Sequence, residues 1–491
     1  MIRLPCPKLS HSISANEIIL RASSWHTVPD FAHLRPKRGA TRSWNWATLS
    51  YMHSRYPLRF VNLEKRTTRW SIFTTDFLLQ STHYDSVSTR CPRDGFIDHY
   101  LGSEYPSHSS DSDKKSYLVS SRISQFLSRT FYFSEQITQS SSKMVPVPED
   151  LPEMEYRYLG PSGLQVSAIS LGGWLTYGGH VEKENTFACM KAAYDAGVNF
   201  FDCAEGYAGG ESERVMGEAI KKFGWKRNDL VISTKIYWGQ ANGEKLANNL
   251  GLSRKRIIEG THLALERLQL DYVDLIYAHR PDRACPMEET VRAFNHLINT
   301  GKAFYWGTSE WTAAEIASAH AVAHRLNLIA PTMEQPLYNL LSRQKVEGEF
   351  LPLYNEFGLG LTTFSPLKFG FLTGKYNAGI PADSRLGTSK DAFADRMRAK
   401  TGDDSWKEDI AAVEKLMPIA EKLNISMANL AMSWVLKNER VSSAITGASK
   451  PEQIFESVRA LKIREKLTPE IMQEIDDVLG NKPEGLPKRY V

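Results

Sequence analysis

Short apolar runs rich in β-branched and aromatic residues alternate with longer amphipathic stretches from about residue 155 onward. This alternation is typical of βα units arranged around a parallel sheet. The clearest helical stretches are residues 183–196, 253–268 and 286–299, the last of which opens with a proline followed closely by two glutamates, a typical helix start. Eight strands are predicted, at residues 168–171, 198–202, 230–234, 273–278, 303–307, 330–334, 360–364 and 443–445.

Eight such units within roughly 290 residues predict an α/β protein with a closed (β/α)8 architecture, the TIM barrel. An open doubly wound sheet would normally have five or six strands, and the sequence contains neither GxGxxG nor GxxxxGK[ST]. Before the first barrel strand, residues 156–160 and 164–167 flank a Pro-Ser-Gly turn at residues 161–163. This pattern predicts an N-terminal β-hairpin that closes the bottom of the barrel.

Residues 1–143 differ in composition from the rest of the chain. They hold 19 of the 60 Lys and Arg residues, 11 of the 56 Asp and Glu residues and only 3 of the 32 glycines, so this part is basic and the remainder slightly acidic. No periodic apolar face runs through it. We therefore expect an extension that is either disordered or the result of a misassigned gene start, followed by the barrel domain at residues 144–491. A targeting segment, a nucleic-acid-binding arm and a folded accessory domain are the alternatives.

The composition limits the class of protein further. Hydrophobic residues make up 42% of the chain, yet no run of about eighteen apolar residues occurs, so no transmembrane helix is expected. The five cysteines form no CxxC pair, which argues against a zinc ribbon and a disulfide framework. His320 and His324 lie four residues apart but lack the intervening glutamate of an HExxH motif. We expect a cytoplasmic protein with no metal site.

Polar residues stand where the predicted strands end. Barrel enzymes place their chemistry at the C-terminal ends of the strands, so these residues should converge on one rim. Taken singly, each has a structural explanation, because Asp and Ser often cap helices and a lone Lys, Tyr or His is more often structural than catalytic. The convergence makes them candidates; they are Asp202, Tyr207, Lys235, His279, Ser309, Gln335, Ser365, Gly447 and Ser449.

Several of these residues lie in motifs that together resemble the aldo-keto reductases. The motifs are Asp-Cys-Ala-Glu-Gly-Tyr at 202–207, Ser-Thr-Lys at 233–235, Ala-His-Arg-Pro-Asp at 278–282, Tyr-Trp-Gly-Thr-Ser at 305–309 and Gly-Ala-Ser at 447–449. Within that family, the sequence is most similar to the branch of voltage-gated potassium channel β subunits and their plant and fungal relatives. The resemblance covers about residues 155–480 and implies an NADP(H)-dependent oxidoreductase that reduces aldehydes or ketones to alcohols.

Carbonyl reduction requires a proton donor beside the carbonyl oxygen and stabilisation of the developing alkoxide. Tyr207 is the candidate acid, but its ordinary pKa of about 10 would have to fall by ~3 for strong acidity near neutral pH. An ammonium ~4 Å away can supply about 4 kcal/mol at an effective dielectric near 20, and Lys235 is positioned to be that ammonium. Asp202 would keep Lys235 charged and oriented, while His279 would orient the carbonyl or relay the proton.

The resemblance also implies a set of cofactor-binding residues. Ser309 and Gln335 would bind the nicotinamide carboxamide, and Lys375 with Arg385 would bind the adenosine 2′-phosphate that distinguishes NADP from NAD. Tyr237 and Trp238, which follow Lys235, would either wall the substrate site or pack against the barrel rim. The remaining cofactor positions are Trp174 and Asp202 at the ribose and nicotinamide, Ser365, Pro366 and Leu367 at the pyrophosphate, and Gly447, Ser449, Gln453 and Glu456 at the adenosine.

A second function stays open, because relatives in the channel branch are regulatory subunits. On this alternative the chain is a cofactor-binding protein like a potassium channel β subunit, with slow redox-sensing turnover and an ion channel or other membrane protein as partner. His279 favours the enzyme, since the channel subunits carry asparagine there. Glu310 and Asp383 replace an arginine and a tyrosine, which either weakens cofactor retention or marks a different branch. A homo-oligomer is open under both functions, and no nucleic-acid partner is expected.

Every candidate residue lies after residue 143, so a shortened protein that starts at Met144 should have the same kcat/KM as the full chain. Comparing the two proteins with one aldehyde and NADPH measures this. A loss of turnover on truncation would contradict the proposed domain boundary.

Overall fold

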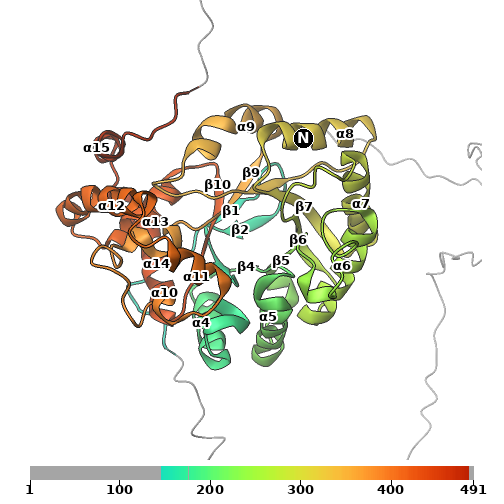
Figure 1. Cartoon of the computed structure of the whole chain (residues 1–491), viewed down its shortest axis with the longest axis horizontal. Coiled ribbons are helices and arrows are strands. Elements are labelled where there is room, and N and C mark those ends of the chain that lie inside the picture. The colour runs from blue at the N-terminus through green and yellow to red at the C-terminus, as the bar shows by residue number, and fades with distance from the viewer. Residues whose placement is uncertain (1–144, 175, 486–491) are drawn as a thin grey trace, which may run out of the picture. The chain divides into compact units, whose positions relative to one another are not determined.

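The structure, a computed structural model, describes residues 145–174 and 176–485, so the predicted extension at residues 1–143 lies outside the described residues. Within the described part, parallel strands close into a barrel, as the sequence pattern predicted (Figure 1). Around the barrel the order starts at β10, continues from β3 to β9 and closes on β10 again. The strands are β3 (Ile169–Gly172), β4 (Phe200–Asp202), β5 (Val231–Ile236), β6 (Val273–Ala278), β7 (Ala303–Ser309), β8 (Met333–Gln335), β9 (Gly360–Phe364) and β10 (Val441–Thr446).

All eight predicted strands are confirmed, but the sixth begins later than predicted. The sequence pattern placed it at residues 330–334, whereas β8 starts at Met333. Pro331 has no backbone N–H to donate to the neighbouring strand, so regular pairing with β7 begins only where Gly307 lies opposite Met333.

The predicted hairpin is also confirmed, with β1 (Tyr156–Tyr158) and β2 (Gln165–Ser167) paired antiparallel. Leu159 and Val166 pack against residues of the barrel interior, including Leu275. The chain passes so close to the barrel that a Cβ on Gly160, whose φ is +54°, would lie 2.6 Å from the carbonyl oxygen of Thr332. A glycine is therefore required here, and the hairpin closes the N-terminal end of the barrel.

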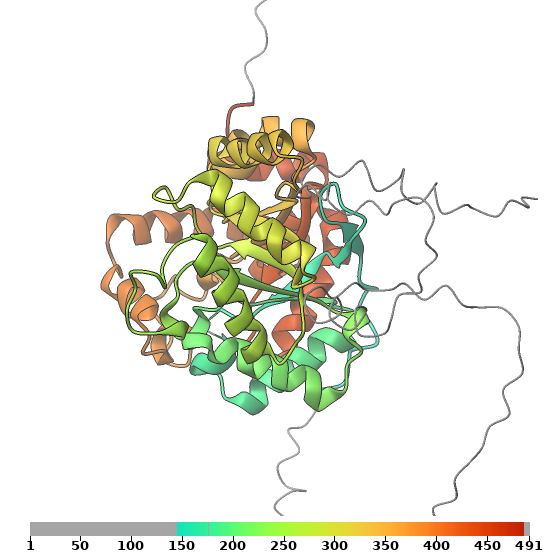
Figure 2. The same ribbon diagram turned by 90° about the vertical axis from the view of Figure 1, so that its right-hand side faces the viewer.

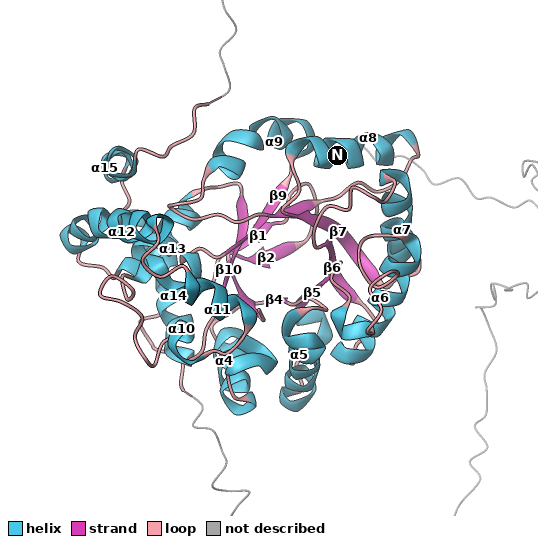
Figure 3. Ribbon diagram, viewed as in Figure 1, coloured by secondary structure: helices cyan, strands magenta, loops and turns pink. Residues whose placement is uncertain are grey.

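Amphipathic helices surround the strands and bury their apolar faces against them (Figure 3). Side chains fix where several of them begin: Ser253 caps α6, and Thr312 with Glu315 forms a capping box on α8. The surrounding helices are α4 (Lys183–Asp195), α5 (Glu211–Phe223), α6 (Arg254–Leu268), α7 (Met287–Asn299), α8 (Ala313–Arg325), α9 (Leu351–Phe357), α13 (Met427–Lys437) and α14 (Pro451–Ile463), followed by α15 (Pro469–Leu479).

The connection between β9 and β10 is much longer than the others and forms a small lobe. Its elements are η6 (Lys368–Thr373), α10 (Arg385–Thr388), α11 (Ala392–Ala399) and α12 (Asp404–Leu423). Figure 2 shows these orange segments on one side of the barrel. The lobe has its own apolar core of Phe371, Tyr376, Leu386, Ala394 and Trp406. Of the helices that the structure describes, none is long and apolar enough to cross a membrane.

Candidate active site

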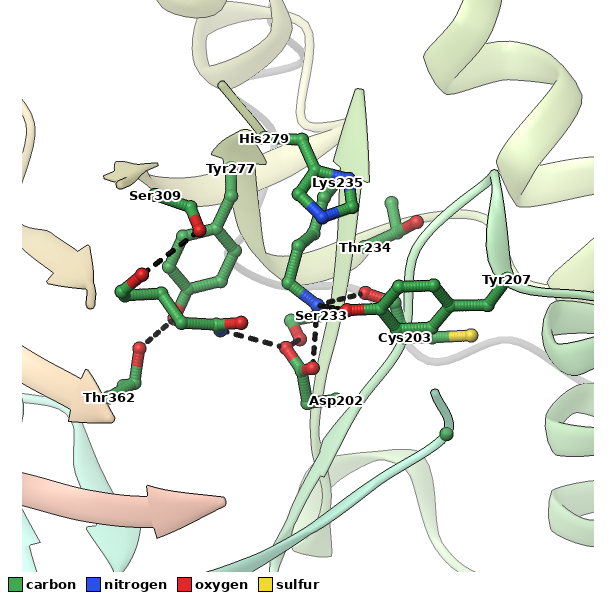
Figure 4. A network of polar contacts seen from close by, with 12 residues as sticks. Asp202, Cys203, Tyr207, Ser233, Thr234, Lys235, Tyr277, His279, Ser309 and Thr362 are labelled. Atoms are coloured by element: carbon green, nitrogen blue, oxygen red, sulfur yellow. Dashed lines mark hydrogen bonds and ion pairs between the residues drawn. The ribbon is translucent and has the colours of Figure 1, made fainter. Parts of the chain in front are cut away.

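Lys235 lies at the centre of the candidate site, completely buried on strand β5. Its ammonium donates to Asp202 Oδ2 at 2.6 Å, to the carbonyl oxygen of Cys203 at 2.8 Å and to the phenolic oxygen of Tyr207 at 2.9 Å (Figure 4). Asp202 ends β4, and Tyr207 begins the short helix η2 (Tyr207–Gly210). The structure therefore brings three of the four predicted catalytic side chains into direct contact.

Asp202 is held in place by two further strands. Its Oδ1 accepts from Ser233 Oγ at 2.7 Å and from Gln335 Nε2 at 3.1 Å. Burial favours a neutral amine at Lys235, but the Asp202 carboxylate and the Tyr207 phenol outweigh it and raise the pKa of Lys235 above its ordinary value. Lys235 is thus a permanent cation at any physiological pH.

The expected fall in the pKa of Tyr207 is wrong for this structure. Burial raises that pKa, and although the Lys235 ammonium lowers it, the Asp202 carboxylate raises it again. The net result is a pKa above the ordinary tyrosine value. The sequence argument counted the attraction of the ammonium but not the cost of removing a phenolate from water. Tyr207 therefore keeps its proton throughout the neutral range.

His279 directly follows β6, and its ring lies beside Tyr207. Its ring meets Tyr207 edge to face with ring centres 5.8 Å apart, and Trp238 in the same manner at 6.4 Å. Burial, together with the positive charges of Lys235 and Arg280, holds the pKa of His279 well below its ordinary value. His279 is thus a neutral imidazole, and its buried Nδ1 has no hydrogen-bond partner among the described residues.

The site opens into a cavity of about 890 Å³ at the C-terminal ends of the strands. Tyr207, His279 and Trp238 line it, while Lys235 lies just behind its wall and Tyr237 packs against the barrel core. All thirteen predicted cofactor-binding residues line the same cavity; they are Trp174, Asp202, Ser309, Gln335, Ser365, Pro366, Leu367, Lys375, Arg385, Gly447, Ser449, Gln453 and Glu456.

Lys375 and Arg385 form a cationic end of the cavity. The guanidinium of Arg385 lies over the Trp174 ring, 4.7 Å from its centre, and its Nε and Nη2 are buried without hydrogen-bond partners among the described residues. Burial and the neighbouring Arg385 charge lower the pKa of Lys375. Two neighbouring cations, with two buried donors of Arg385 left unpaired, fit a bound dianion.

Comparison with known families agrees with this geometry. The sequence profile described as the aldo/keto reductase family matches residues 168–479, which is more than half of the chain. The chain belongs to the aldo/keto reductase family. The matched region includes the whole barrel and every predicted site residue.

Three curated relatives of this aldo/keto reductase are named as voltage-gated potassium channel β subunits. The one from Schizosaccharomyces pombe is 52% identical over 337 residues, 68% of this chain and 95% of the relative. The one from Oryza sativa subsp. japonica is 50% identical over 331 residues, 67% of this chain and 98% of the relative. The one from Arabidopsis thaliana is 48% identical over 338 residues, 69% of this chain and 100% of the relative.

The structure of this aldo/keto reductase adds cavity residues that the sequence analysis missed. Arg280, which directly follows His279, lines the cavity, as do Phe369, Phe393 and Arg396 of the β9–β10 lobe. The sequence feature that could have identified Arg280 as a cavity residue is its position directly after His279. The lobe residues carry no motif, and only the folded lobe brings them to the cavity.

Glu310, noted as a departure from the channel subunits, is not a cavity-lining residue of this reductase. Its carboxylate accepts from the backbone N–H of Leu337 at 2.6 Å and pairs with the Lys345 ammonium at 3.1 Å. Asp383 does not line the cavity either. Both departures thus lie outside the described cavity wall.

Buried charged side chains hold the loop that carries Trp238. Glu205 accepts from the backbone N–H of Tyr237 at 2.8 Å and forms an ion pair with Arg256. Arg256 also donates to the carbonyl oxygen of Asn249 at 2.7 Å, so both ends of the loop are tied to one pair. The Glu205 and Arg256 side chains are at most 2% exposed.

Arg256→Met should lower the free energy of unfolding by about 3–5 kcal/mol, because it leaves the Glu205 carboxylate buried without its cation. Urea unfolding of the reductase measures this loss. Arg254→Met is the matched control, since Arg254 is an exposed arginine two residues away on the same helix. Equal destabilisation by the two substitutions would contradict the proposed contribution of the pair.

Proposed function

We propose that this aldo/keto reductase uses NADPH to reduce aldehydes or ketones to alcohols, with Tyr207 as the general acid. The single observation that carries this proposal is the Lys235 ammonium, which bonds at once to Asp202 and Tyr207 beside a cavity large enough for a dinucleotide and a small substrate. NADPH, when bound, supplies the hydride. The side chains of this chain supply the proton and fix the carbonyl.

Tyr207 is protonated at neutral pH and lines the cavity. As charge develops on the carbonyl oxygen, the phenol donates its proton there, and the Lys235 ammonium at 2.9 Å stabilises the phenolate that remains. A strongly acidic phenol is not needed, because the developing alkoxide is a much stronger base than phenolate. His279, as a neutral imidazole, can donate one hydrogen bond that orients the carbonyl oxygen.

The residues present fit NADPH. Ser309 and Gln335 would hold the nicotinamide carboxamide near Asp202, and residues 365–367 would hold the pyrophosphate. The buried Nε and Nη2 of Arg385, which lack hydrogen-bond partners among the described residues, support a 2′-phosphate at the Lys375 end, because a bound phosphate recovers the free energy that unsatisfied buried donors cost. This is the structural argument for NADPH over NADH.

Tyr207→Phe should lower kcat for reduction of 4-nitrobenzaldehyde at least about 100-fold, since it removes the proton donor and leaves the ring. For the wild type, the pH profile of kcat/KM should stay flat through neutrality and fall only above about pH 10, because activity is lost as Tyr207 deprotonates and its pKa is raised. Tyr237→Phe is the matched control, as its hydroxyl forms no bond with Lys235. Retained turnover in Tyr207→Phe would exclude Tyr207 as the acid.

Replacing both Lys375 and Arg385 by alanine should raise the KM for NADPH about 100-fold and change the KM for NADH less than about threefold, since each charge-assisted bond contributes about 1.5–3 kcal/mol. Steady-state kinetics with both cofactors measure the change. Lys368→Ala is the control, because Lys368 pairs with Asp409 and does not line the cavity. Equal effects on NADPH and NADH would contradict the 2′-phosphate assignment.

The names of the relatives favour a second candidate, a regulatory subunit that attaches to a potassium channel. This candidate fits the 48–52% identity to proteins named as channel β subunits. Two measurements distinguish the regulatory subunit from the enzyme: the rate of carbonyl reduction and binding to a channel. A protein that binds NADPH, reduces no member of a carbonyl panel and co-purifies with a channel would favour the regulatory subunit; rapid reduction would favour the enzyme.

A further inference from the structure

Arg280 brings a positive charge to the substrate side of the cavity. It follows His279 at the end of β6, and its Nη1 donates to the carbonyl oxygen of His279 and to Ser309 Oγ at 3.1 Å. These two bonds fix the guanidinium at the cavity wall, where Trp238 and Tyr207 also lie. Both bonds use the same nitrogen, which leaves the rest of the planar guanidinium available to a ligand.

No acidic side chain of the described residues neutralises Arg280. The carboxylates that line the cavity are Asp202, which is paired with Lys235, and Glu456, which lies on α14 and accepts from Ser426 Oγ at 2.7 Å. Asp282, two residues along, accepts instead from the backbone N–H of Leu252 at 2.8 Å. The substrate side therefore carries one uncompensated cation.

This cation is distinct from the pair at the other end of the cavity. Lys375, Arg385 and the further cavity-lining arginine Arg396 belong to the β9–β10 lobe. Arg280 instead belongs to the β6 end, beside the side chains proposed for proton transfer. His279 contributes no charge there, because its imidazole is neutral. An anion that approaches Tyr207 and His279 would thus meet a single guanidinium.

We propose that Arg280 forms a carboxylate subsite, so that the preferred substrates are aldehydes or ketones that also carry a carboxylate. This inference rests on the proposed carbonyl reduction and names its substrate class. A guanidinium presents parallel N–H groups that match the two oxygens of a carboxylate, and such a contact is stronger and more directional than one to a neutral group. The carboxylate would anchor the substrate on the β6 side while the carbonyl oxygen lies at Tyr207.

The experiment compares matched acids and esters. The 2-, 3- and 4-carboxybenzaldehydes differ from their methyl esters only in charge and one methyl group, and the three isomers sample different separations between carbonyl and carboxylate. For at least one isomer, the wild type should reduce the acid at least tenfold better than its ester, judged by kcat/KM. Arg280→Gln should lower this acid-to-ester ratio at least tenfold, chiefly through the KM of the acid, and Arg280→Lys should recover part of it.

Two controls separate a carboxylate subsite from a general effect of charge or of cofactor binding. Arg283→Gln removes an arginine three residues away whose side chain is 80% exposed and paired with Glu315, so the ratio should not change. The dissociation constant of NADPH, measured by fluorescence in Arg280→Gln, tests the contact with Ser309. A ratio that stays the same while NADPH binding weakens would overturn the inference and assign Arg280 to the cofactor.

The outcomes distinguish this inference from the proposed function. Reduction of the esters with no preference for any acid would overturn the carboxylate subsite and leave carbonyl reduction intact. If neither acids nor esters are reduced, carbonyl reduction fails, and calorimetry with 2-, 3- and 4-(hydroxymethyl)benzoate decides the subsite separately. Hydroxymethylbenzoate binding that is at least tenfold weaker in Arg280→Gln would support the carboxylate subsite. No binding to the wild type, or equal binding to both proteins, would overturn the subsite.

Discussion

A buried ammonium is the constraint on which the site depends. Removing a charged amine from water costs several kcal/mol, so Lys235 is tolerable inside the barrel only because Asp202 and two further oxygens surround it. The register of the sheet creates this arrangement. Asp202 lies opposite Ser233 on the neighbouring strand, and Lys235, two residues on, points to the same side as Ser233. A shift of one residue would turn the ammonium away from its carboxylate.

Some charged side chains at the cavity are paired with an opposite charge and others are not. The paired charges hold the structure of the site, whereas the unpaired cations are free to bind anions. Lys235 and Asp202 neutralise one another, as do Glu205 and Arg256 beneath the loop. Arg280, Lys375 and Arg385 form no ion pair with an acidic side chain of the described residues, and Arg385 keeps two buried donors unpaired. Buried donors without partners weaken the free protein, so an anion that bound at Arg385 would contribute stability as well as affinity.

The sequence pattern predicted the barrel strands, the hairpin and strand-end candidates such as Asp202 and His279, because strand period, turn chemistry and the positions of strand ends are local properties of the chain. The resemblance to the aldo-keto reductases, and not the pattern, implied the other cofactor-binding residues, Lys375 and Arg385 among them. The sequence pattern did not predict the β9–β10 lobe, because the core of the lobe joins residues as far apart as Phe371 and Trp406. The predicted direction of the Tyr207 pKa shift was wrong for a related reason. Burial is a property of the whole fold, and its effect on this pKa outweighs that of the Lys235 ammonium.

The neutral state of His279 limits what this side chain can contribute to the site. A neutral imidazole and a carboxamide can each donate one hydrogen bond to a carbonyl oxygen. Because burial and two nearby cations keep His279 uncharged, exchanging it for asparagine would change the reach and direction of the donor but not the charge of the site. On the proposed mechanism, proton transfer therefore depends on Tyr207 and Lys235, and residue 279 would orient the carbonyl toward them.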